Sequence, residues 1–140
     1  MSELKAAEEE LIDDFRLFDN WMDRYQYIID LGKQLPDFPE EWRTDDCKIR
    51  GCQSQVWLRT ECADGRLSFQ AISDSAIVSG LIAILMRVYS GRQAHEIVGS
   101  TPAFIAEIGL DEHLSPTRSN GLNSMIAAIR EAAGRCDGTA

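Results

Sequence analysis

The sequence predicts an α+β fold in which several helices pack on one small antiparallel sheet. Apolar residues recur at helical spacing near both ends of the chain, whereas they alternate with polar residues from Val56 to Ala71, and an Asp64-Gly65 pair divides that alternating stretch. Because the strand-like residues are clustered and do not alternate with helices, the pattern favours α+β over a parallel α/β sheet. A chain of 140 residues can bury one core, so we expect a single domain over residues 1–140.

Two amphipathic helices are predicted in the first 32 residues. Apolar side chains recur every three or four positions through an acidic background, and the pattern restarts after Asp19-Asn20. Gly32 and the prolines that follow it end the helical run, which predicts a loop over about 36–46. The apolar positions are Leu4, Leu11, Phe15, Phe18, Trp21, Tyr25, Ile28 and Ile29.

The period of two that begins at Val56 predicts a β-hairpin. Asp64-Gly65 favours a type I′ turn, in which both central residues have positive φ. Residues 48–51 are a candidate for a further edge of the same sheet.

Four more helices are predicted after the hairpin. Ser73 or Asp74 can cap a central core helix that begins near Ser75 and ends at Gly91. A short helix is expected over 94–98, and another begins at Pro102, since proline favours the first helical position. The last helix carries the apolar residues Leu122, Met125, Ile126 and Ile129.

The net charge of −9 lies entirely in the first third of the chain, where residues 1–46 hold fourteen acidic and five basic side chains. An acidic surface repels phosphate backbones, so we expect no nucleic-acid partner. The sequence has no basic, apolar leader, and its longest apolar run is far too short to span a bilayer. We therefore expect a cytoplasmic protein with no membrane partner.

Four cysteines in a reducing compartment predict free thiols, a catalytic thiol or metal ligands, and not disulfides. Cys52 stands out in the run KIRGCQSQVW. Lys48 and Arg50 would stabilise its thiolate, and Gly51 and Gln53 are poor core material. A reactive thiol and a buried structural thiol remain even alternatives for Cys52 on pattern alone.

The other cysteines carry weaker signals. Cys47 is ambiguous, whereas Cys62 and Cys136 are assigned no role, so that Cys136→Ser is expected to be silent. The spacing C-x4-C-x9-C does not match the paired C-x2-C knuckles of structural zinc, and the two histidines are isolated. We therefore expect no metal site.

Three motifs resemble one known family. GCQSQVWL (51–58), SDSAIVSGLIAIL (73–85) and HLSPTRSNGLNSMIAAI (113–129) are similar to the SufE family of sulfur acceptors, and DNWMDRYQYIIDLGKQLP resembles the opening of that family. The motifs occur in the family order and cover nearly the whole chain. The resemblance implies a SufE/IscU-like α+β fold.

The resemblance also implies a reaction. Cys52 would receive a persulfide sulfur from a SufS-type or CsdA-type cysteine desulfurase, stimulate that enzyme and pass the sulfur to an iron–sulfur scaffold. Pyridoxal phosphate would belong to the desulfurase, so that this chain needs no cofactor of its own. Asp74, Arg118 and Gly121 would shape the surface around the cysteine loop. The SufE and CsdE branches, the cognate desulfurase and the choice between monomer and homodimer stay open.

Two other functions remain alternatives. An iron–sulfur scaffold needs about four thiolate-like ligands, and only Cys47 and Cys52 are close in sequence. A thiol redox sensor would instead join Cys47 and Cys52 in a regulatory disulfide.

Overall fold

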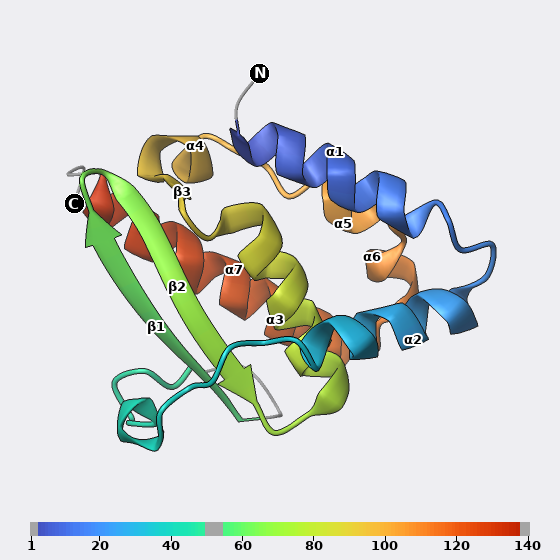
Figure 1. Ribbon diagram of the computed structural model, residues 1–140, viewed down its shortest axis with the longest axis horizontal. Coiled ribbons are helices and arrows are strands. Elements are labelled where there is room, and N and C mark those ends of the chain that lie inside the picture. Colours follow the sequence, from blue (N-terminus) through green and yellow to red (C-terminus); the bar gives the residue numbers. More distant parts are fainter. Residues whose placement is uncertain (1–2, 50–54, 138–140) are drawn as a thin grey trace.

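The computed structural model describes residues 3–49 and 55–137, and its fold is α+β, as the sequence predicts (Figure 1). The strands are β1 (Val56–Ala63), β2 (Arg66–Ser73) and β3 (Arg92–Gln93), in the antiparallel order β1-β2-β3. The helices are α1 (Glu3–Phe15), α2 (Trp21–Gly32), the 3-10 helix η1 (Glu40–Trp42), α3 (Ala76–Tyr89), α4 (Ala94–Val98), α5 (Phe104–Glu107), α6 (Leu110–His113) and α7 (Pro116–Cys136).

The β1–β2 hairpin turns at the predicted dipeptide. Asp64 and Gly65 have φ values of 53° and 78°, as a type I′ turn requires. Leu67, Phe69 and Ala71 point into the core from one face of β2. The alternate side chains lie on the outer face of the hairpin, because successive strand residues point to opposite sides.

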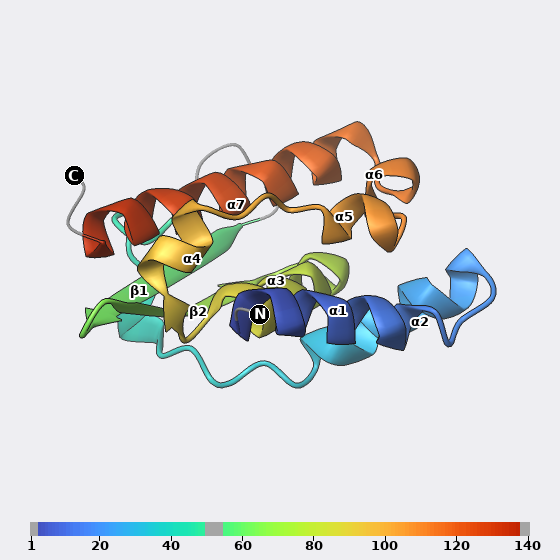
Figure 2. The same ribbon diagram turned by 90° about the horizontal axis from the view of Figure 1, so that it is seen from above.

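Helix α3 is the centre of the molecule and contacts α1, α2, α7 and β2. Figure 2 shows α7 and α1 on opposite sides of it. The N-cap is Ser75, whose hydroxyl accepts from the Val78 amide at 3.4 Å, and the predicted caps Ser73 and Asp74 are wrong. The Ser73 hydroxyl accepts from the Ser75 amide and the Asp74 carboxylate accepts from the Gln55 amide, so both side chains have other partners.

Glycines let α2 and α3 cross closely. A Cβ on Gly32 would lie 2.6 Å from the Gly80 amide nitrogen, and a Cβ on Gly80 would collide with the backbone and side chain of Ile28. The two helices therefore touch backbone to backbone, which places α3 at Gly80 firmly against α2.

The other predicted helices are present with one shift, but η1, which lies within the predicted loop, and α6 were not predicted. Gly91, two residues after the end of α3, has φ 79°, and Ser115 caps α7 with Pro116 in its first turn. The helix expected at Pro102 instead begins at Phe104, because the amides of Ala103 and Ile105 donate to the carbonyls of Thr101 and Pro102 and form a turn there.

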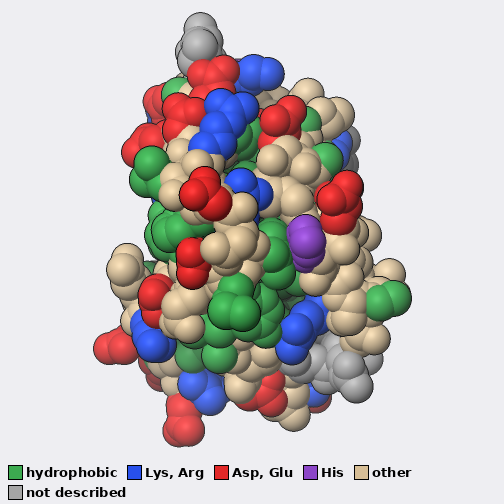
Figure 3. Space-filling model, turned by 90° about the vertical axis from the view of Figure 1, so that its right-hand side faces the viewer, with side chains coloured by type: hydrophobic (Ala, Val, Ile, Leu, Met, Phe, Trp, Pro, Cys, Tyr) green, Lys and Arg blue, Asp and Glu red, His purple; other side chains and the backbone are tan. Residues whose placement is uncertain are grey.

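One end of the molecule is apolar on its surface. Leu17 and Met22, on either side of the α1–α2 turn, are 79% and 80% exposed. Figure 3 views this end and shows hydrophobic side chains gathered among acidic and basic ones.

No helix among the described residues is long and apolar enough to cross a membrane.

The prediction of free thiols is wrong for two cysteines. Cys62 and Cys136 form a disulfide, with their Cα atoms 5.6 Å apart. Cys62 lies near the end of β1 and Cys136 is the last residue of α7, two elements that pack together. Tertiary packing alone brings the two sulfurs together, because the residues are 74 positions apart in the chain.

Candidate functional site

The cysteine segment is held at both ends by backbone pairing. The amide of Ile49 donates to the carbonyl of Val56 at 2.9 Å, and the amide of Leu58 donates to the carbonyl of Cys47 at 2.7 Å. An antiparallel bridge between Lys48 and Trp57 lies between these two bonds. Residues 47–49 therefore add an edge to the sheet beside β1, as the sequence suggests for the described part of 48–51.

We call this paired region the stem, comprising residues 47–49 and 55–58. The chain enters the segment that carries Cys52 from Ile49 and returns at Gln55. The predicted site residues Arg50, Gly51, Cys52 and Gln53 lie outside the described residues. The structure shows how the two sides of the stem that flank this segment are anchored.

Asp74 fastens the returning side of the stem. Its carboxylate accepts a hydrogen bond from the amide of Gln55 at 3.1 Å, and its own amide donates to the Gln55 carbonyl at 3.4 Å. Asp74 lies between β2 and α3, and α3 is buried in the core. The carboxylate thus links the stem to the start of the central helix.

A groove of about 450 Å³ runs beside the stem, between β1 and α7. The free thiol of Cys47 is half-buried and lines this groove together with Lys48, which is exposed. On the opposite wall, α7 contributes small residues such as Ala127 and Ala128. The stem therefore carries a thiol and a cation next to an open groove.

Arg118 and Gly121 occupy the first turns of α7. The guanidinium of Arg118 donates to the hydroxyl of Tyr25 on α2 at 3.4 Å, whereas Gly121 is buried. Within the described residues, no hydrogen bond or ion pair joins Arg118 to Asp74 or Lys48. The structure thus ties Asp74 directly to the stem and ties Arg118 to α2.

The Cys62–Cys136 disulfide lies away from the stem. From Val56 to Cys62, β1 advances six residues, or about 20 Å at about 3.3 Å per residue. The disulfide is consequently a feature of the far end of the hairpin. Among the described residues, no group of three or more His, Cys, Asp and Glu side chains is arranged to hold a metal ion.

The sequence did not predict two of the residues that form hydrogen bonds with the candidate site residues. Gln55 takes part through its backbone, which no residue type reveals, and Tyr25 was identified only as a core position of the first helical region. Its hydroxyl, which can pair with a guanidinium, was the available signal. The disulfide partners gave no signal, because 74 residues separate them.

Comparison with known proteins identifies the family of this chain. The family model "SufE: Fe-S metabolism associated domain" matches residues 9–133. An uncharacterized SufE-like protein of Rhizobium meliloti (strain 1021) is 49% identical over 133 residues, covering 91% of this chain and 95% of the relative. A second uncharacterized SufE-like protein, from Rhizobium etli, is 48% identical over 134 residues, covering 91% and 90%.

A solved structure supports the fold alone. The solution structure of a hypothetical protein from Thermus thermophilus matches with a TM-score of 0.77 at 16% identity, covering 96% of this chain and 97% of that one.

The family match covers most of the chain and indicates a sulfur-transfer role with a cysteine desulfurase. This chain belongs to the SufE family.

Proposed function

We propose that Cys52 accepts a persulfide sulfur from a cysteine desulfurase, stimulates that enzyme and passes the sulfur toward iron–sulfur cluster assembly in the cytoplasm. The observation that carries the proposal is the stem: the backbone hydrogen bond from Ile49 to Val56 and the Asp74 contact to Gln55 anchor the two ends of the segment that contains Cys52. Family membership supports the reaction class.

The transfer is a thiol exchange. The Cys52 thiolate attacks the terminal sulfur of the enzyme persulfide, a new S–S bond forms to Cys52, and the bond to the enzyme sulfur breaks. The enzyme cysteine leaves as a thiolate, and the proton on the terminal sulfur stays on that sulfur, which becomes the outer sulfur of the Cys52 persulfide. No net oxidation occurs, because the sulfane sulfur only changes its carrier.

The chain's own residues would contribute position and charge. Lys48 on the stem and Arg50 beside Cys52 in sequence favour the thiolate, and a thiolate reacts much faster than a thiol. Asp74 keeps the returning stem strand in place. Pyridoxal phosphate would act in the desulfurase, upstream of any step on this chain.

Mass spectrometry tests the proposal directly. The protein is incubated with a SufS-type or CsdA-type desulfurase and L-cysteine, alkylated and digested. We expect one or more added sulfur atoms on the peptide that contains Cys52, with none in Cys52→Ser. Cys47→Ser is the matched control and should still be loaded. Sulfur found on Cys47 in the Cys52→Ser protein would refute the assignment.

The scaffold alternative is less well supported. A cluster needs about four ligands, and Cys62 and Cys136 are bonded to each other. Only Cys47 and Cys52 would then remain as thiolates. An anaerobically reconstituted protein that binds iron with visible absorption, in wild type but not in Cys52→Ser, would favour the scaffold over the acceptor.

A further inference from the structure

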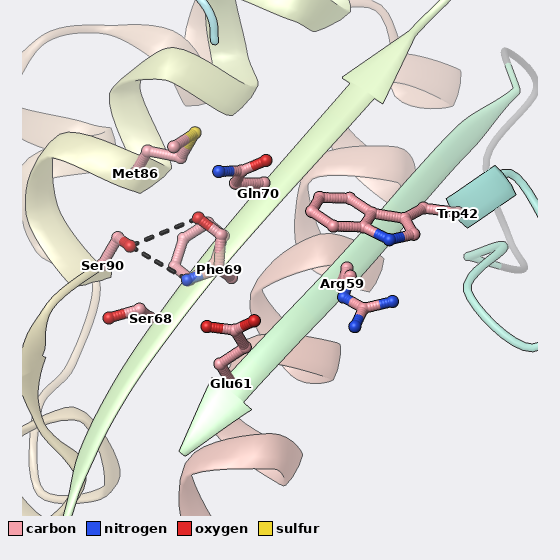
Figure 4. A pocket seen from close by; sticks show the side chains of 8 residues that line it. All are labelled: Trp42, Arg59, Glu61, Ser68, Phe69, Gln70, Met86 and Ser90. Carbon is pink, nitrogen blue, oxygen red and sulfur yellow. Dashed lines mark hydrogen bonds between the residues drawn. The ribbon is translucent and has the colours of Figure 1, made fainter. Parts of the chain in front are cut away.

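A cavity of about 250 Å³ opens on the outer face of the β1–β2 hairpin, away from the stem groove (Figure 4). Arg59 pairs with Gln70 and Glu61 with Ser68 in the strand register, so the four side chains share this face. Trp42 of η1 extends over one side of the cavity. Phe69, Met86 and Ser90 complete the lining.

The cavity carries opposite charges that do not pair with each other. The guanidinium of Arg59 stacks on the indole of Trp42, 4.3 Å from the ring centroid. In the part of the chain that the structure describes, neither Arg59 nor Glu61 belongs to any ion pair. The stacking holds Arg59 at one edge of the cavity, and its N–H groups remain available to a carboxylate.

The amide of Gln70 adds an unsatisfied acceptor. Its oxygen is shielded from solvent and accepts no hydrogen bond from the described residues. A shielded acceptor without a donor is unfavourable, and nearly all such groups in proteins find a partner. Rotation of the terminal amide would turn this oxygen toward a donor that enters the cavity beside Glu61.

Met86 and Trp42 give the cavity an apolar part. Met86 lies across the cavity from the indole of Trp42, which suits an aliphatic or sulfur-containing side chain. The cavity has a volume of about 250 Å³. This volume lies below the usual range for drug-sized ligands, so a ligand of fewer than about ten non-hydrogen atoms fits best.

We propose that this cavity binds a free α-amino acid as its zwitterion, with the carboxylate on Arg59, the ammonium on Glu61 and Gln70, and the side chain between Trp42 and Met86. A zwitterion satisfies both unpaired charges at once, which neither a simple anion nor a simple cation does. The proposal is independent of sulfur acceptance at Cys52, because it concerns the isolated protein and other residues.

The test follows the indole N–H signal of Trp42 by NMR, assigned with Trp42→Phe, during titration with L-alanine, L-cysteine (under reductant) and L-methionine. We expect a saturable shift with at least one of them. The methyl ester, which lacks the carboxylate, and the N-acetyl derivative, which lacks the ammonium, should each bind at least about tenfold more weakly.

Variants separate the site from general effects. Arg59→Gln and Glu61→Gln should each weaken binding about tenfold or more, with unchanged thermal unfolding. Arg43→Gln is the matched control, because Arg43 also stacks on a tryptophan, at 5.6 Å from the Trp57 ring, but does not line the cavity. No saturable shift with any of the three amino acids up to about 20 mM would overturn the proposal, as would equal binding of both blocked derivatives.

Discussion

Asp74 and Gln55 are joined by two hydrogen bonds, one from the Gln55 amide to the Asp74 carboxylate at 3.1 Å and one from the Asp74 amide to the Gln55 carbonyl at 3.4 Å. These bonds link the start of the central helix region to the strand that leaves the cysteine segment. A side chain that lies 22 residues after Cys52 in the sequence therefore restrains the stem.

Replacing Asp74 by Ala should loosen the stem without unfolding the protein. One exposed hydrogen bond contributes about 0.5–1.5 kcal/mol, so we expect a small loss of stability and hydrogen exchange at the Gln55 amide about two- to tenfold faster. Asp74→Asn keeps an acceptor oxygen and should restore most of the protection. Equal exchange in all three proteins would show that this contact does not restrain the stem.

Replacing Lys48 and Arg50 together by Gln should raise the pKa of Cys52, because nearby positive charge stabilises the thiolate. Lys48 and Arg50 would thus matter most near neutral pH, where the thiolate fraction limits the reaction rate. The rate of iodoacetamide alkylation against pH, measured in a Cys47→Ser background, reports the midpoint. If the alkylation midpoint is unchanged in the Lys48 and Arg50 variant but shifts in Arg118→Gln, then Arg118 stabilises the thiolate instead.

Replacing Cys136 by Ser should destabilise the protein, contrary to the expectation from sequence. Its disulfide with Cys62 closes a loop between residues 74 positions apart, and such cross-links typically contribute about 2–4 kcal/mol. The melting temperature should fall by roughly 7–14 °C for a chain of this length. Dithiothreitol should lower the melting temperature of the wild type by the same amount as the Cys136→Ser substitution does. It should have no effect on the melting temperature of the Cys62→Ser/Cys136→Ser protein. A wild type insensitive to dithiothreitol would contradict the prediction.

Replacing Gly80 by Ala should cost more than a usual helix substitution would suggest. Alanine favours helix by about 1 kcal/mol over glycine, but its Cβ would meet the Ile28 backbone. The helices must separate, so we expect a net loss of about 1–3 kcal/mol, measured by urea unfolding. Gly32→Ala, on the facing helix, should behave alike. Increased stability in either variant would mean that α2 and α3 do not pack this closely.

The elements that the sequence predicted well have local causes. The hairpin turn depends on Asp64 and Gly65, and the start of α2 depends on the side chain of Asn20, which accepts from the Asp23 amide at 2.9 Å. The cap of α3 was predicted less well, because Ser73, Asp74 and Ser75 are all good caps and only their other partners choose among them.

By itself, the sequence determined the α+β class, the order of the longer helices and the hairpin, and the family, since these follow from hydrophobic period, turn residues and motifs within short stretches of chain. It also singled out Cys52 by its neighbours. Only the tertiary structure decided the contact of Asp74 with Gln55, the disulfide between Cys62 and Cys136 and the cavity beneath Trp42. Each of these joins residues that are distant in the chain, and their proximity depends on how helices and strands pack.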